Sequence, residues 1–234
     1  MRIVASLATM PGREECLQKA IASIAPQVDA LVVHFNGSGA VSPRAAMLGT
    51  PNNVFAQGSL ENRGDQMKFL CGTHHDGDWR LTCDDDLIYP PDYVATLVSW
   101  ASKLNGPVGA HGSKLLPPFD DYYLSRTSYH FAVPLAEATE VDVLGTGTLC
   151  WYDGWYAFSK ADFPEPNMAD IWAAVAFKRA ERSLWVVPHP GDWVKDGNPG
   201  SSKSIYLSGR QRDGSFLDTA DRQTAAIRQH GDLF

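Results

Sequence analysis

The sequence predicts an α/β fold in which a central, mostly parallel sheet is flanked by helices. The first observation is that the first half of the chain alternates short apolar runs with amphipathic segments, the order typical of strands and helices in such a sheet. The second is that the apolar run at 79–83 leads directly into Asp84-Asp85-Asp86. Acidic residues are thereby expected at the carboxyl end of a strand, where parallel sheets bind their ligands.

The individual elements follow from apolar runs, helical spacing and turn residues. In the first half, strands are expected at 3–8, 30–35, 54–56, 79–83 and 107–111, and helices at 13–25, at about 65–75 and from Pro90-Pro91-Asp92 onward. In the second half, 117–140 is expected to be loop-rich, with strands at 141–149, 157–159 and 184–187 and helices at 168–179 and 217–229. The Gly-, Pro- and Ser-rich segment 190–204 is predicted to be a flexible lid.

Composition narrows the class of protein. The 234 residues are 44% hydrophobic and 20% charged, as in ordinary globular proteins, and neither a repeat nor a clear linker divides them, so one domain over 1–234 is expected. A net charge of −7 without a basic run argues against binding to a nucleic-acid backbone. Four scattered cysteines without a CxxC pair argue against zinc and favour a reducing compartment. With no signal peptide and no long apolar span, the sequence predicts a cytoplasmic protein without a transmembrane segment.

The Asp triplet carries the strongest chemical signal. Alternate residues of an extended segment point the same way, so Asp84 and Asp86 are expected to converge while Asp85 points elsewhere. Carboxylates this close repel one another, and a divalent cation relieves that cost. Oxygen ligands favour Mg²⁺ or Mn²⁺, which complete their coordination with substrate phosphates. The alternative interpretation is a solvated acidic turn.

With these residues the chain resembles a GT-A glycosyltransferase, most similar to the family 2 type, over about residues 1–190. The resemblance rests on Thr9 and Arg13 after the first strand, Asn36 after the second, the Gly64-Asp65-x-x-Lys68 segment, and the Asp-x-Asp motif at Asp84–Asp86. It implies a Rossmann-like GT-A fold and a nucleoside-diphosphate sugar donor, linked to UDP or GDP. It also implies a Mn²⁺ or Mg²⁺ ion that bridges Asp86 to the donor diphosphate, with Asp84 near the ribose or sharing the metal.

The same resemblance makes seven residues candidates for donor binding: Thr9, Arg13, Asn36, Asp65, Lys68, Asp84 and Asp85. Thr9 would contact the base or ribose, Arg13 the base or diphosphate, and Lys68 a phosphate. Plainer interpretations remain open for several of them. Arg13 and Lys68 can face solvent on their helices, Asn36 can form a turn with Gly37, and Asp65 can cap a helix.

The catalytic residue is expected at the start of the helix at 168–179. An inverting transfer needs a general base for the acceptor hydroxyl, and Asp170 occupies the position that the resemblance implies. The chain departs from the usual Glu-Asp pair by having Ala169 before it, and a helix-capping role for Asp170 stays open. His189 is a candidate third metal ligand or a structural histidine.

The acceptor side is predicted from the glycines and aromatic residues of the second half. Candidates for binding acceptor or sugar are Gly147, Thr148, Trp151 and Trp172. Glycine permits close approach to a ligand, and aromatic rings pack on sugars. A β-bulge at the glycines, or a core position for the aromatic rings, explains the same residues. Lys195 or Lys203 of the expected lid would contact the diphosphate.

Together these features predict a metal-dependent, inverting glycosyltransferase that acts in glycan or polysaccharide biosynthesis on a glycan, lipid-linked or other hydroxyl acceptor. Residues 1–115 would form the nucleotide-sugar-binding half, and 116–234 the acceptor-binding half. The alternative is a nucleotidyltransferase acting on a sugar phosphate. That class usually has a Gly-rich, basic phosphate loop after its first strand, whereas residues 8–13 contain one Gly and one Arg. A non-catalytic sugar-binding module would need neither the acidic cluster nor a base.

Overall fold

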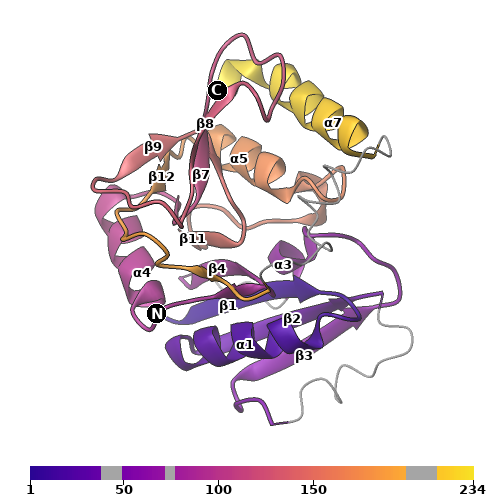
Figure 1. Cartoon of the computed structure of the whole chain (residues 1–234), viewed down its shortest axis with the longest axis vertical. Coiled ribbons are helices and arrows are strands. Elements are labelled where there is room, and N and C mark those ends of the chain that lie inside the picture. The colour runs from indigo at the N-terminus through magenta and orange to yellow at the C-terminus, as the bar shows by residue number, and fades with distance from the viewer. Residues whose placement is uncertain (38–48, 72–76, 199–214) are drawn as a thin grey trace.

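A computed structural model describes residues 1–37, 49–71, 77–198 and 215–234 of the 234-residue chain. Its central feature is an eight-stranded sheet of order β3-β2-β1-β4-β11-β6-β12-β9 with helices packed against it (Figure 1). The strands are β1 (Ile3–Thr9), β2 (Ala30–Asn36), β3 (Val54–Ser59), β4 (Trp79–Asp84), β6 (Val108–Gly109), β9 (Thr139–Val141), β11 (Thr148–Tyr152) and β12 (Leu184–Val186). The predicted α/β class with a mostly parallel, Rossmann-like sheet is confirmed.

Strand direction places the carboxyl ends of β1, β2, β3 and β4 at one edge, because these four strands are mutually parallel. The register pairs Ala8 with Asp84 and Thr9 with Phe35, so the ends of β1, β2 and β4 are level. β11 runs antiparallel to both β4 and β6, and β9 runs antiparallel to β12. The acidic triplet therefore leaves the sheet beside the end of β1.

Two small sheets extend from this core. One has the order β10-β7-β8, and the other pairs β13 with β5 in antiparallel fashion. Their strands are β5 (Leu87–Ile88), β7 (Gly112–Leu115), β8 (Arg126–Tyr129), β10 (Val143–Leu144) and β13 (Lys195–Asp196). The β5–β13 pair brings the segment after His189 back alongside the residues that follow the Asp triplet.

Helices cover both faces of the sheet, and the strand residues alternate accordingly. The helices are α1 (Glu14–Ile24), α3 (Met67–Leu70), α4 (Tyr93–Leu104), α5 (Ala169–Arg179) and α7 (Ser215–Gln229), with 3-10 turns η1 (Ala25–Gln27), η2 (Lys160–Asp162) and η3 (Gly231–Leu233). On β11, Cys150 packs with the cluster under α1 and α4, whereas Leu149 and Trp151 pack with the cluster under α3 and α5. Helices α5 and α7 lie side by side (Figure 1). No helix in the described part of the chain is long and apolar enough to cross a bilayer.

Some predicted elements differ from the structure. The strand expected at 157–159 is an irregular segment, because Ser159 caps η2: its backbone N–H donates to Asp162 at 2.7 Å. The loop-rich segment 117–140 contains β8 and the start of β9. The helix expected at about 65–75 is present as α3, and residues 72–76 lie outside the described chain. The predicted lid at 190–204 is described only to residue 198 and includes β13, so the expectation for Lys203 falls outside the described residues.

Candidate active site

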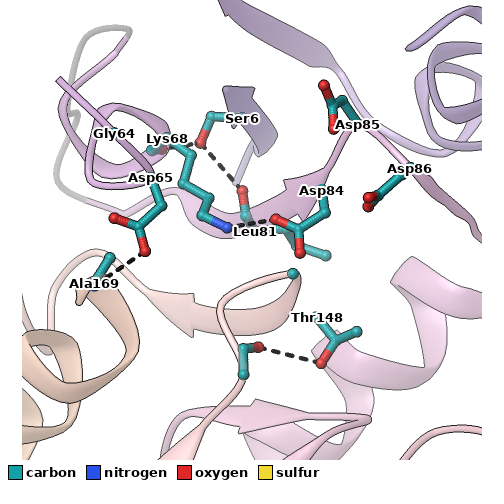
Figure 2. Close-up of polar contacts among 12 residues, drawn as sticks. Ser6, Gly64, Asp65, Lys68, Leu81, Asp84, Asp85, Asp86, Thr148 and Ala169 are labelled. Carbon is teal, nitrogen blue, oxygen red and sulfur yellow. Dashed lines mark hydrogen bonds and ion pairs between the residues drawn. The ribbon is translucent and has the colours of Figure 1, made fainter. Parts of the chain in front are cut away.

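The Asp triplet begins at the last residue of β4 and continues into the turn before β5. The side chains of Asp84 and Asp86 remain 42% and 29% exposed, whereas that of Asp85 is only 7% exposed. Asp84 points toward Lys68, while Asp85 and Asp86 lie on its other side (Figure 2). The chain leaves the strand after Asp84, so Asp85 and Asp86 lie in the turn, and the convergence of Asp84 and Asp86 on one ion stays a prediction. The turn gives each carboxylate its own surroundings.

Asp85 is the buried, structural member of the triplet. It accepts a hydrogen bond from Thr9 Oγ1 at 2.5 Å. The Arg13 guanidinium donates two more, through Nε at 2.8 Å and Nη2 at 2.6 Å. The hydrogen bond to Asp85 is the main reason why the pKa of Arg13 is raised. Thr9 and Arg13, both expected to touch the donor, thus hold the turn after β4 against the end of β1.

Asp86 shares the same arginine. Arg13 Nη2 lies 2.6 Å from Asp86 Oδ2. Burial raises the pKa of Asp86, and the neighbouring charges of Asp84 and Asp85 raise it further against the opposing effect of Arg13. With Asp84, the turn carries three carboxylates against the two cations Arg13 and Lys68, so one negative charge is left that a further cation would offset.

Asp84 forms an ion pair with Lys68, whose Nζ lies 2.5 Å from Asp84 Oδ1. The Lys68 side chain is only 4% exposed. Burial disfavours its charge, but the carboxylates of Asp84 and Asp65 outweigh burial and raise its pKa. Lys68 therefore faces a carboxylate and does not lie on a solvated helix face, and its contact with a donor phosphate stays a prediction.

Gly147 lies directly against Asp84 from the opposite side. A Cβ atom at this position would collide with the Asp84 carboxylate, so only glycine fits the observed arrangement. Tyr89 fixes the approach, because its hydroxyl donates to Gly147 O at 2.8 Å and accepts from the Asp84 backbone N–H at 2.8 Å. The sequence did not predict a role for Tyr89 in the site, since a tyrosine three residues after an acidic motif has the pattern of an ordinary core residue.

Asp65 connects this cluster to the start of α5. Its Oδ2 accepts a hydrogen bond from the Ala169 backbone N–H at 3.1 Å, while the buried Oδ1 has no partner among the described residues. Burial raises the pKa of Asp65 to about 6, although the Lys68 charge opposes this. Asn36 supports the turn that leads to Asp65, because its Nδ2 donates to Gly64 O at 3.1 Å. Asp65 thus reaches across to another helix.

Asp170 lies in the first turn of α5, next to the residue that Asp65 holds (Figure 2 shows the Asp65–Ala169 contact). Its Oδ2 accepts a hydrogen bond from Tyr122 at 3.3 Å, and its Oδ1 accepts from the Ile171 backbone N–H at 3.0 Å. Burial raises the pKa of Asp170. The residue remains partly accessible to solvent, although its carboxyl group has a raised pKa.

Three predicted acceptor residues lie in the interior. Thr148 is 1% exposed and accepts a hydrogen bond from the Ala110 backbone N–H at 3.2 Å. Trp151 is fully buried against Phe69 and Phe158, and Trp172 is 7% exposed. Trp151 is enclosed by aromatic rings of the core and Trp172 is buried, so neither presents an exposed ring in this structure. The core interpretation that the sequence left open fits them.

His189 lies apart from the acidic turn. It is 5% exposed, stacks on Trp193, and its Nδ1 lies 3.0 Å from Pro190 O, while Nε2 has no partner among the described residues. Within residues 1–37, 49–71, 77–198 and 215–234, no group of three or more His, Cys, Asp or Glu side chains is arranged to hold a metal ion. In this conformation His189 therefore does not complete a three-ligand set with Asp84 and Asp86.

No protein-family model and no curated protein matches the sequence. Among solved structures, the chain is similar to the crystal structure of S. aureus TarS 1–349, a glycosyltransferase, with a TM-score of 0.50 and 9% sequence identity. The chain has a Rossmann-like glycosyltransferase fold. The similarity covers 82% of this chain and 59% of the TarS chain, so the sequence spans less than two thirds of that structure. At 9% identity the likeness concerns the fold alone.

Proposed function

We propose that the protein is a metal-dependent glycosyltransferase that moves a sugar from a UDP- or GDP-linked donor to an acceptor hydroxyl with inversion. The observation that carries the proposal is the connection of two sites by one short segment. Lys68 binds Asp84 at the end of β4, and Asp65, one turn earlier, binds the first residue of α5 beside Asp170. A donor-binding acidic turn and a candidate base are thereby held in one cluster.

Asp86 and Asp84 are the proposed ligands of Mn²⁺ or Mg²⁺. Both offer carboxylate oxygens, which these ions prefer, and both are accessible while Asp85 is buried. Three carboxylates meet two cations here, Arg13 and Lys68, so one negative charge is left for a bound ion to offset. A bound ion would supply positive charge to the departing nucleoside diphosphate. Arg13 and Lys68, whose side chains are 10% and 4% exposed, pair with these carboxylates and would hold them in position beside the ion.

Asp170 is the proposed general base. It would accept the proton of the acceptor hydroxyl while that oxygen bonds to the anomeric carbon and the bond to the nucleoside diphosphate breaks. A raised pKa suits a base, because proton transfer is most effective when the pKa lies nearer the working pH. Tyr122 and the Ile171 backbone N–H fix the carboxylate. Inversion follows from a single displacement assisted by one base.

The proposal is tested by thermal shift with UDP- and GDP-sugars, with and without Mn²⁺. A donor should raise the melting temperature only when Mn²⁺ is present, by an amount equivalent to about 2.7 kcal/mol at 100 times its Kd. Asp86→Ala should abolish this stabilisation, because it removes a metal ligand. Asp120→Ala, which removes an exposed carboxylate paired with Arg228, serves as the control and should retain it. Equal stabilisation without metal, or in Asp86→Ala, would refute the metal assignment.

A further inference from the structure

Arg126 is a cation near Asp170 that has no role in the site described above. Arg126, the first residue of β8, stacks its guanidinium over the rings of Tyr122 and Tyr123, at 4.3 Å and 4.6 Å from their centroids. Tyr122 is the residue whose hydroxyl donates to Asp170. One aromatic ring therefore separates the arginine from the candidate base.

The charge of Arg126 acts on Asp170. Burial raises the pKa of the Asp170 carboxyl group, and Arg126 is among the groups that oppose this rise. The two residues come from different parts of the fold, since Arg126 belongs to the small β10-β7-β8 sheet and Asp170 to α5. The small sheet thus delivers a positive charge to the acceptor side of the proposed site.

The arginine is also unusual in its partners. Three other cations of the described chain that are largely buried each have a carboxylate: Arg13 has Asp85, Lys68 has Asp84 and Lys178 has Asp142. Arg126 is partly buried, yet within the described part of the chain its guanidinium forms neither a hydrogen bond nor an ion pair. Stacking on aromatic rings leaves the edge N–H groups of a guanidinium available. Those donors suit a planar or tetrahedral anion, which they bind through paired hydrogen bonds.

We propose that Arg126 binds an anionic group, a phosphate or a carboxylate, carried by the acceptor whose hydroxyl is presented to Asp170. That the bound molecule is the acceptor rests on the proposed function. The anion site itself rests on the geometry of Arg126. The net charge of −7 would repel an anionic acceptor from the protein as a whole. Arg126, stacked on two tyrosine rings, offsets that repulsion locally, where the acceptor must be held.

The test compares three probes that differ in one substituent: glucose, glucuronate and glucose 6-phosphate. Binding to the full chain is measured by ligand-observed NMR titration, without nucleotide and with EDTA to remove metal effects. At least one anionic probe should bind about 10-fold more tightly than glucose, the scale of hydrogen bonds to a charged group. The stronger of the two anionic probes shows whether phosphate or carboxylate is preferred.

Arg126→Gln keeps the stem on the tyrosine rings and removes the charge, so it should abolish the preference for the anion. Arg126→Lys should restore part of it. Arg182→Ala is the matched control, because Arg182 also stacks on an aromatic ring, Trp155, but follows the far end of α5, roughly 15 Å along the helix from Asp170. It should retain the full preference. Circular dichroism confirms that each variant is folded.

Two outcomes of the probe titrations would overturn the inference. One is equal binding of all three probes by the wild-type protein. The other is an anion preference that survives in Arg126→Gln. Loss of metal-dependent nucleotide-sugar stabilisation in Arg126→Gln would assign the arginine to the donor and also overturn it. Failure of the proposed function is distinguishable, because it would remove donor stabilisation from the wild-type protein while leaving the anion preference intact.

Discussion

Neighbouring carboxylates acquire different chemistry from their immediate contacts. In the triplet, Asp85 is enclosed by Thr9 and Arg13, while Asp84 and Asp86 stay accessible and each meets one cation. Asp65 is the extreme case, because its buried Oδ1 has no hydrogen-bond partner among the described residues. At the scale of single residues, burial and the nearest charge decide whether an acid is a structural anchor, a ligand or a proton acceptor.

Asp65 should make stability depend on pH. Its folded-state pKa of about 6 lies above the ordinary value of 3.8, so the folded state binds the proton more tightly than the unfolded state. Its contribution is complete below about pH 4 and is lost as the pH rises through 6, by about 3 kcal/mol for a shift of about two units. Urea unfolding between pH 4 and 8 measures this loss. Asp65→Asn cannot titrate and should show a shallower decline, unlike the exposed control Asp232→Asn. An unchanged decline in Asp65→Asn would contradict the prediction.

Asp170 should matter for turnover and not for donor binding. Asp170→Asn keeps the size of the side chain: its one oxygen can still accept from the Ile171 N–H, and its Nδ2 can donate to the Tyr122 hydroxyl oxygen, so the fold should be preserved. Loss of the base should lower turnover by about 10²-fold or more. Steady-state kinetics with a responsive donor, together with its Mn²⁺-dependent thermal shift, separate the two effects. Wild-type turnover in this variant would place the base elsewhere.

At the scale of elements, the site is built from strand ends and the turns that follow them. The level ends of β1 and β4 bring Thr9 to Asp85, and the turn between β10 and β11 presses Gly147 against Asp84. The pairing of β13 with β5 places the Gly197 N–H 2.6 Å from the Asp86 carbonyl oxygen. Each loop is short and held by backbone contacts, so small changes in a turn should move the carboxylates.

Gly147→Ala tests this dependence. The added methyl group would occupy the space of the Asp84 carboxylate, which must rotate away and leave Lys68. We expect a stability loss of about 1–3 kcal/mol, as for overpacking, together with loss of metal-dependent donor stabilisation. Thermal unfolding with and without donor and Mn²⁺ measures both. Gly231→Ala is the control, because a methyl group there would meet no atom within 4 Å. Retained donor stabilisation in Gly147→Ala would show that the Asp84 position is not critical.

At the scale of the whole molecule, a buried polar link reinforces the packing of the small sheet against α5, which already share one hydrophobic cluster. Asp142 is 3% exposed and lies between the small sheet and α5. Its carboxylate accepts a hydrogen bond from the Leu115 backbone N–H at 2.9 Å and forms ion pairs with Lys114 Nζ at 3.1 Å and Lys178 Nζ at 3.3 Å. The sheet that carries Arg126 is thereby fixed to the helix that carries Asp170.

Asp142→Ala should therefore be strongly destabilising. Removing one partner of a buried ionic cluster leaves the others without compensation, at a cost of about 3–5 kcal/mol. Chemical denaturation measures the change in the free energy of unfolding. Glu15→Ala removes a carboxylate from an exposed pair with Lys19 on α1 and should leave stability nearly unchanged. A loss in Asp142→Ala no larger than that of Glu15→Ala would mean that Asp142 does not link the two parts.

The sequence by itself determined the class of fold and the place of the acidic turn. Apolar runs and helical spacing located β1, β2, β4, α4 and α5 to within a few residues, because local periodicity reports which side of an element is buried. The order of strand and helix then required a parallel sheet, and the carboxyl end of β4 had to carry Asp84. Asp170 was placed in the first turn of a helix for the same local reason.

Only the tertiary structure decided what these residues touch. Thr9, Arg13 and Asp85 meet across more than 70 residues of chain, and Asp65 reaches Ala169 across 104. From the sequence, Trp151 and Trp172 could equally be sugar-binding residues or core residues, and the structure buries both. Arg126 gave no sequence signal, since its surroundings come from strand pairing and from two tyrosines earlier in the chain. Periodicity fixes an element's buried side, whereas contacts between distant elements depend on how those elements pack.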